Sequence, residues 1–110
     1  MSTWEEIRKV HTWLPKTSEG WHQHPNGEGW VQDTASVDLT AYVGPEALVY
    51  GKAQVYGASI VYGEAQVCGE ARVYDKARVY GGTHVYGETR VCGQAMVYGK
   101  AQVSGKIHIR

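Results

Sequence analysis

An aliphatic residue recurs at every sixth position from Val31 to Ile109 without interruption. In the central repeats a glycine follows two positions later and a small residue four positions later, so the unit reads V-Y-G-x-A-x, as in residues 49–54. A period of six excludes an amphipathic helix, whose apolar face repeats near 3.6 residues, and simple strand alternation, which repeats every two. It is typical of a parallel β-helix, in which short strands stack coil upon coil. We therefore predict an all-β chain.

The unit resembles the hexapeptide repeat, whose consensus is an aliphatic residue followed four positions later by a small one. That family folds as a single-stranded, left-handed parallel β-helix of triangular section, and the resemblance implies this fold and hand here. Three hexads make a coil of 18 residues, so residues 31–110 give about four coils. Only Ile107 departs from the small residue at its position.

The place of a residue within its hexad predicts whether its side chain points into the core or out to solvent. The aliphatic residues are expected to point inward as three continuous ladders, with the small residues inside near the corners. Glycine at the third position and a polar residue at the fourth predict a corner in which one residue adopts a positive φ. Four hexads lack that glycine, so we expect a different corner geometry at Asp33, Leu39, Pro45 and Asp75.

Residues 1–30 lack the repeat and form an N-terminal cap ahead of the repeat region, residues 31–110. Thr3 and Glu6 match a capping box, and helically spaced apolar residues continue to Leu14, which predicts a short helix over residues 1–14. Pro15 is expected to end this helix.

A tight-turn dipeptide, Asn26-Gly27, lies between Trp21 and Trp30 and predicts a hairpin. A β-helix ends in an open strand edge, which invites aggregation unless it is covered. We therefore expect the helix and this Trp- and His-rich segment to cover the edge of the first coil.

The chain has 110 residues and a formal net charge of zero, which fits one compact domain and argues against nucleic-acid binding driven by overall charge. No apolar run approaches the ~18 residues that a membrane span needs, and the N-terminus lacks a signal region. No membrane association is expected, and the expected location is the cytoplasm.

The outward residues lie immediately before and after each inward aliphatic residue, and folding three hexads to a coil sorts them onto three faces. The tyrosine face carries Tyr42, Ile60, Arg78 and Met96 in one column and Gly44, Tyr62, Tyr80 and Tyr98 in the other. The arginine face carries Gln54, Arg72, Arg90 and His108 beside Tyr56, Tyr74, Cys92 and Arg110. The mixed face carries Trp30, Leu48, Gln66, His84 and Gln102 beside Gln32, Tyr50, Cys68, Tyr86 and Ser104.

The tyrosine face is too apolar for solvent, and such patches usually mark a protein interface. The alternative is that its tyrosines only satisfy strand propensity on an outer surface. Hexapeptide proteins often associate as trimers through one face, so the resemblance implies a homo-oligomer, with a trimer favoured and a dimer second. The predicted interface residues are Tyr42, Ile60, Tyr62, Arg78, Tyr80, Met96 and Tyr98; a further ligand or partner surface comprises Tyr56, Arg72, Tyr74 and Arg90.

Cysteine and histidine are the residues with reactive chemistry. Cys68 and Cys92 are expected on different faces as free thiols, which suits a reducing compartment. Catalysis by either would need a base such as His84 or His108.

Two further histidines, His22 and His24, are candidate metal ligands, with His11 as a third. Two ligands that lie two residues apart make a weak metal pattern. A role as capping residues that hydrogen-bond to the first coil explains these histidines better, and no metal is predicted.

Three function classes fit the residues. Hexapeptide acyltransferases use a histidine base near the groove between subunits and commonly carry a protruding loop, whereas here no hexad is interrupted. A coenzyme A-dependent acyltransferase is therefore an alternative, a nucleotide- or single-strand-binding module is another, and no cofactor is predicted. Since the repeats look like those of small β-helix proteins from bacteria and phages, we predict a non-catalytic, rigid, oligomeric scaffold binding another macromolecule through its Tyr and Arg faces. A phage-encoded inhibitor of a host protein would be one such scaffold.

Overall fold

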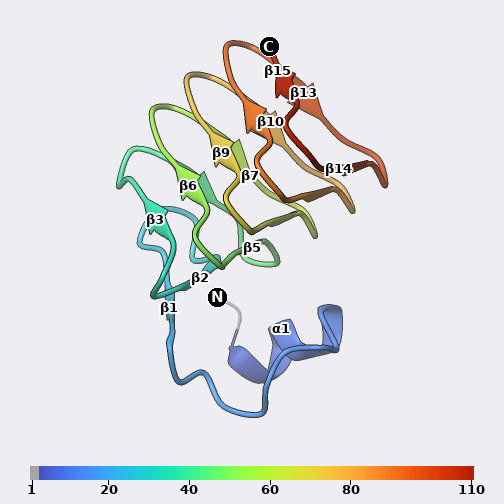
Figure 1. Cartoon of the computed structure of the whole chain (residues 1–110). Helices are drawn as coiled ribbons and strands as arrows, with labels where there is room; N and C mark the ends of the chain where they lie inside the picture. The colour runs from blue at the N-terminus through green and yellow to red at the C-terminus, as the bar shows by residue number, and fades with distance from the viewer. Residues whose placement is uncertain (1–2) are drawn as a thin grey trace.

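The computed structural model describes residues 3–110 and shows a parallel β-helix of about four coils with one short N-terminal helix (Figure 1). From Trp30 onward consecutive strands belong to different sheets, so each coil adds one strand to each of three sheets. Facing residues in neighbouring coils are eighteen positions apart, as in the pair Arg78 and Met96. The predicted all-β fold and coil length are confirmed. Within this range no helix is long and apolar enough to cross a membrane.

The three sheets correspond to the three faces defined from the sequence. The mixed face is built from β1 (Trp21–Gln23), β2 (Trp30–Gln32), β5 (Leu48–Val49), β8 (Gln66–Val67), β11 (His84–Val85) and β14 (Gln102–Val103). The tyrosine face is built from β4 (Tyr42–Val43), β7 (Ile60–Val61), β10 (Arg78–Val79) and β13 (Met96–Val97). The arginine face is built from β3 (Ser36–Val37), β6 (Gln54–Val55), β9 (Arg72–Val73), β12 (Arg90–Val91) and β15 (His108–Ile109).

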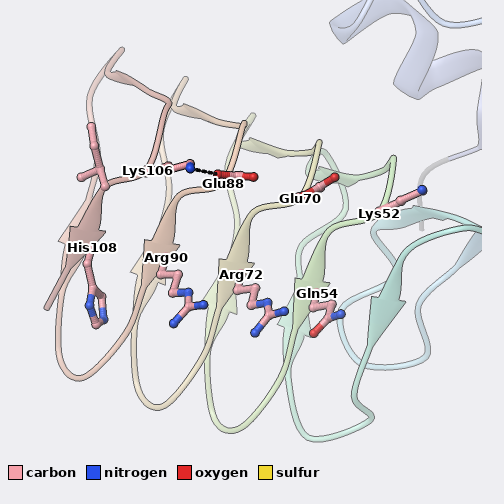
Figure 2. A pocket seen from close by; sticks show the side chains of 9 residues that line it. Lys52, Gln54, Glu70, Arg72, Glu88, Arg90, Lys106 and His108 are labelled. Atoms are coloured by element: carbon pink, nitrogen blue, oxygen red, sulfur yellow. Dashed lines mark ion pairs between the residues drawn. The ribbon is translucent and has the colours of Figure 1, made fainter.

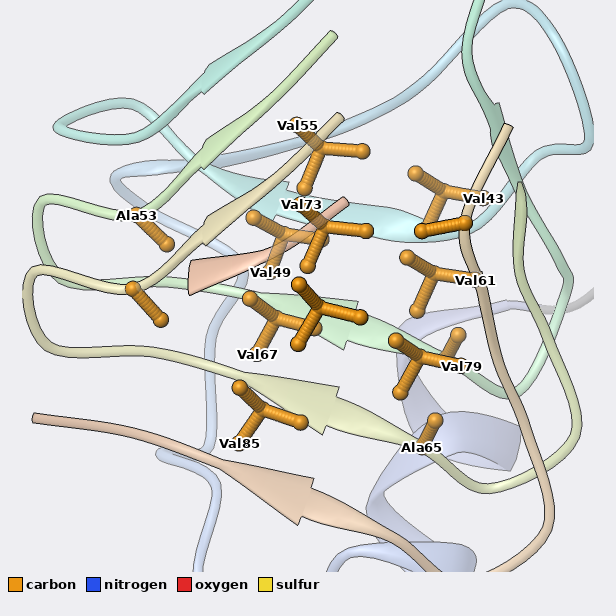
Figure 3. Close-up of a cluster of buried hydrophobic side chains, with 14 of the residues drawn as sticks. Val43, Val49, Ala53, Val55, Val61, Ala65, Val67, Val73, Val79 and Val85 are labelled. Carbon is orange, nitrogen blue, oxygen red and sulfur yellow. The ribbon is translucent and has the colours of Figure 1, made fainter. Parts of the chain in front are cut away.

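The core consists of the predicted inward ladders (Figure 3). The valines of the central coils are fully buried, and the alanines four positions later are buried beside them. Three of these small-residue positions hold Ser59, Thr83 and Thr89 instead, and each hydroxyl donates to the carbonyl three residues earlier. A hydroxyl is tolerated inside because it is hydrogen-bonded there.

The corners follow the predicted glycine geometry, with one correction. Gly51 and its equivalents in the regular hexads have φ near +70°, the left-handed region that glycine enters without steric cost. Asp75 takes the same conformation, with φ of 62°, so the expectation of a different corner there is wrong. Its side chain accepts a hydrogen bond from Gly93 N at 3.0 Å, and aspartate is among the few residues that tolerate this region.

Helix α1 (Trp4–Val10) is shorter than predicted. Thr3 caps it as expected, with its hydroxyl accepting from Glu6 N at 3.2 Å, whereas residues 1 and 2 of the predicted helix lie outside the described residues. The helix ends at Val10, five residues before Pro15, because the His11 backbone leaves the helical region and its ring binds the Glu46 carbonyl at 2.8 Å.

The helix packs against the side of the coils and not against their open end, which corrects our expectation. Trp4 and Ile7 of α1 form a second apolar cluster with Leu14 and with Trp30 and Leu48, the outward residues of β2 and β5. These two outward residues are apolar and buried, so the helix covers the first coils of the mixed face.

The predicted hairpin forms and covers part of the first-coil edge. Strand β1 pairs antiparallel with β2, and the connecting residues 24–29 run along β4. Gly29 N donates to Val43 O at 2.8 Å, Val43 N donates to Asn26 O at 3.0 Å, and the His24 ring bonds to Ala41 O at 2.9 Å. These bonds satisfy backbone groups that an uncovered edge would leave unpaired.

Candidate interaction surfaces

The tyrosine face presents two columns of side chains in register. Tyr62, Tyr80 and Tyr98 form a continuous stack, with ring centroids 4.8 and 5.4 Å apart and ring planes within 8° and 11° of parallel. The neighbouring column is Ile60, Arg78 and Met96, which face one another across the parallel strands. Met96 and Tyr98 are 54% and 59% exposed, so apolar area is open to solvent on this face of the single chain.

Tyr42 belongs to the cap more than to the stack, although it lies on the same face. A Cβ atom on Gly27 would come within 2.9 Å of the Tyr42 ring, and one on Gly44 within 3.4 Å of it. The ring therefore fills the space left by these two glycines and is half-buried.

The arginine face brings together the four predicted partner residues. Tyr56 and Tyr74 stack at 5.0 Å with planes 3° apart, and Arg72 lies opposite Arg90 in the next coil. A groove of about 650 Å³ runs along the corner beside the arginine column (Figure 2). It is lined by Lys52, Gln54, Glu70, Arg72, Glu88, Arg90, Lys106, Ile107 and His108.

The sequence analysis did not identify the residues at the corner of the coils as part of this groove. Lys52, Glu70, Glu88 and Lys106 all occupy the fourth hexad position and recur every eighteen residues, so their spacing held the signal. Lys106 and Glu88 form an exposed ion pair at 3.8 Å, a contact that contributes little stability. Neither arginine of the groove takes part in an ion pair with any residue between 3 and 110.

The mixed face carries a chain of polar contacts beneath the cap. Tyr50 donates its hydroxyl proton to Gln66 Oε1 at 2.9 Å, and the Gln66 amide lies 3.0 Å from His11 Nδ1. His84 Nε2 lies 3.3 Å from both the Tyr50 hydroxyl and Cys68 Sγ. The network links the N-terminal segment to three successive coils.

Each cysteine lies against one of the two histidines that the sequence offered as possible bases, although the sequence analysis did not pair them. Cys68 Sγ is 3.3 Å from His84 Nε2, and Cys92 Sγ is 3.0 Å from His108 Nε2. In both pairs the cysteine follows an inward aliphatic residue and the histidine precedes the one in the next coil, so they are diagonal neighbours sixteen residues apart. The equal spacing was the available signal.

Burial keeps the Cys68 site neutral. It raises the pKa of the Cys68 thiol, against a smaller opposing effect of the hydrogen bond with Tyr50, and it raises the pKa of the Tyr50 hydroxyl. Burial, and secondly the charge of His11, lower the pKa of His84 from its usual 6.5. A nucleophilic cysteine needs a lowered pKa and a protonated neighbour, so this pair fits a structural contact.

The lowered pKa of His84 predicts a dependence of stability on pH. Below pH 6.5 the unfolded state binds a proton at His84 that the folded state resists, so the free energy of unfolding falls as the pH falls below this value. We expect the melting temperature to decrease between pH 7.5 and 5.5, and His84→Gln to reduce that decrease. Thermal unfolding followed by circular dichroism measures both, and an unchanged dependence in the variant would contradict the assignment.

The three histidines considered as metal ligands have separate partners. His22 lies 2.7 Å from Asp33 on the exposed side of β1, His24 is buried against the Ala41 carbonyl, and His11 binds Glu46. Across residues 3–110 no three His, Cys, Asp or Glu side chains gather in a way that would hold a metal ion.

Comparison with known proteins supports the fold class. A family model described as the YdcK beta-solenoid repeat matches the chain twice, over residues 65–81 and 71–87. The two matches begin one hexad apart and lie in the central coils. No curated protein and no solved structure matches the chain. The chain is thus a β-helix protein with a central segment similar to this β-solenoid repeat.

Proposed function

We propose that the protein is a rigid, non-catalytic, homo-oligomeric scaffold that self-associates through its tyrosine face and presents its arginine face to another macromolecule. The observation that carries the proposal is the stack of Tyr62, Tyr80 and Tyr98 beside exposed Met96. A rigid surface of aromatic rings loses little conformational entropy on binding. The left-handed hexapeptide-repeat form and its trimeric assembly are part of the proposal, and so is a cytoplasmic location, which the free thiols of Cys68 and Cys92 suit.

The two columns of the tyrosine face complement each other. If the symmetry axis is parallel to the long axis of the β-helix, each coil lies at the same height as the same coil of the second copy. The column of residues before the valines in one copy then contacts the column after the valines in the other. Arg78 therefore faces Tyr80, and Met96 faces Tyr98, of the second copy. An arginine over a tyrosine ring and a thioether beside one are both favourable contacts.

An antiparallel arrangement suits the same face less well. Reversing the second copy places each column over itself, and with all four coils overlapped Arg78 would face Ile60 of the other copy. That contact would take a guanidinium out of water against an apolar side chain with no compensating partner. The level-matched arrangement is therefore favoured, and it is compatible with two or three subunits.

We expect Tyr80→Glu to convert the oligomer to a monomer, because it places a carboxylate in the middle of the ring stack. Native mass spectrometry at several concentrations measures the subunit number. Tyr74→Glu is the matched control, since Tyr74 is stacked in the same way on the arginine face. An unchanged mass for Tyr80→Glu, or dissociation by Tyr74→Glu alone, would show that the tyrosine face is not the interface.

Disulfide formation between two single variants tests the arrangement of the copies in that oligomer. With Cys68 and Cys92 replaced by alanine, a mixture of Arg78→Cys and Tyr80→Cys proteins should cross-link, and neither variant should do so alone. Cross-linking of Arg78→Cys with Ile60→Cys would instead indicate the antiparallel arrangement.

A further inference from the structure

The groove on the arginine face contains two cations that no carboxylate of the described chain neutralises. Arg72 and Arg90 are exposed and directly opposite each other on β9 and β12. Parallel strands in a sheet are about 4.8 Å apart, so the two positive charges are held close by the backbone register. Like charges directly opposite destabilise a strand pair, which an anion bound between them would relieve.

The glutamates of the groove lie on its other wall. Glu70 and Arg72 flank the buried Ala71, and the chain turns a corner between them. Figure 2 shows the guanidinium ends of Arg72 and Arg90 side by side and directed away from Glu70 and Glu88. The wall that carries the arginines is therefore positive, although carboxylates line the opposite wall.

The excess of positive charge is local. Lys52, Arg72, Arg90 and Lys106 line the groove against only Glu70 and Glu88, whereas the whole chain has a formal net charge of zero. His108, whose Nε2 lies 3.0 Å from Cys92 Sγ, lines the groove at the end of the arginine column. The volume of about 650 Å³ is in the range of small-molecule sites.

We propose that this groove binds the diphosphate group of a small molecule, with Arg72 and Arg90 each contacting one phosphate. Guanidinium groups bind phosphate oxygens in a bidentate manner, and two of them in adjacent coils match two linked phosphates better than one isolated anion. This site goes beyond the scaffold and does not depend on self-association, because all of its residues come from one chain.

Isothermal titration of the full chain with inorganic pyrophosphate, without divalent cations, tests the proposal. We expect saturable binding that Arg72→Gln and Arg90→Gln each weaken at least tenfold. Lys76→Gln is the matched control and should leave the affinity unchanged, because Lys76 is an exposed cation at the fourth hexad position that lines neither the groove nor the tyrosine face. ADP should bind as pyrophosphate does and adenosine should not, which identifies the diphosphate as the recognised group.

Three results would overturn the site. One is the absence of binding at millimolar pyrophosphate, and another is equal weakening by Lys76→Gln, which would indicate unspecific charge attraction. The third is tighter binding of a short oligothymidylate than of ADP, which would assign the face to a nucleic-acid strand. A monomeric Tyr80→Glu protein should keep its pyrophosphate affinity, so failure of the scaffold proposal and failure of this one are distinguishable.

Discussion

Val73→Asp is expected to abolish folding, as seen by loss of the strand signal in far-ultraviolet circular dichroism. Val73 is fully buried in the centre of its ladder, with Val55 and Val91 in register on either side. A carboxylate there has no partner and costs several kcal/mol, and the lost valine costs about 2 kcal/mol more. Domains are stable by only about 5–15 kcal/mol, and a disrupted central coil removes the packing partner of the coils on both of its sides.

A second variant distinguishes buried charge from polarity alone. Ala77 is as deeply buried as Val73 but occupies the small-residue position where Ser59 donates its hydroxyl to Tyr56 O at 2.8 Å. Ala77→Ser should make the equivalent bond to the Tyr74 carbonyl and change stability by less than about 1 kcal/mol. A folded Val73→Asp protein with an unchanged melting temperature would contradict the inward ladder.

The repeat region was predictable because one physical rule is repeated in it. Each valine has the same environment as the valine eighteen residues later, so the inward ladders and the three faces follow from the spacing. The positive φ at the corners was predicted from the conformational freedom of glycine. Asp75 adopts the same backbone conformation without being a glycine, because its side chain accepts a hydrogen bond from Gly93 N.

Contacts between unlike segments were not predictable in the same way. Helix α1 could cover either the open end of the first coil or the apolar side chains of Trp30 and Leu48 on the mixed face. The hexad periodicity does not indicate which of these two surfaces gains more from burial. The Cys68 and His84 contact requires knowing that diagonal neighbours meet, and the groove requires the directions of Arg72 and Glu70. The spacing places the members of each feature in neighbouring coils, but side-chain direction and competition between surfaces decide which of them meet.

The close contact between the hairpin connection and the first coil leads to the second large effect. A Cβ atom on Gly29 would be 2.3 Å from both Gly44 O and Val43 Cγ1, and 2.7 Å from Val43 O. These are mostly backbone atoms of the first coil, so they cannot move aside cheaply. Gly29→Ala should therefore force residues 24–29 away from β4 and break the bond from Gly29 N to Val43 O.

We expect Gly29→Ala to lower the free energy of unfolding by about 3 kcal/mol or more and the melting temperature by on the order of 10 °C. Gly82→Ala is the control, because its added Cβ meets nothing closer than Gly99 O at 3.6 Å, and it should be neutral or slightly stabilising. Urea unfolding of both variants measures the difference. Because the uncovered β4 edge can pair with another chain, Gly29→Ala should also aggregate faster on heating, and equal stability of the two variants would mean that the hairpin connection is not a structural cap.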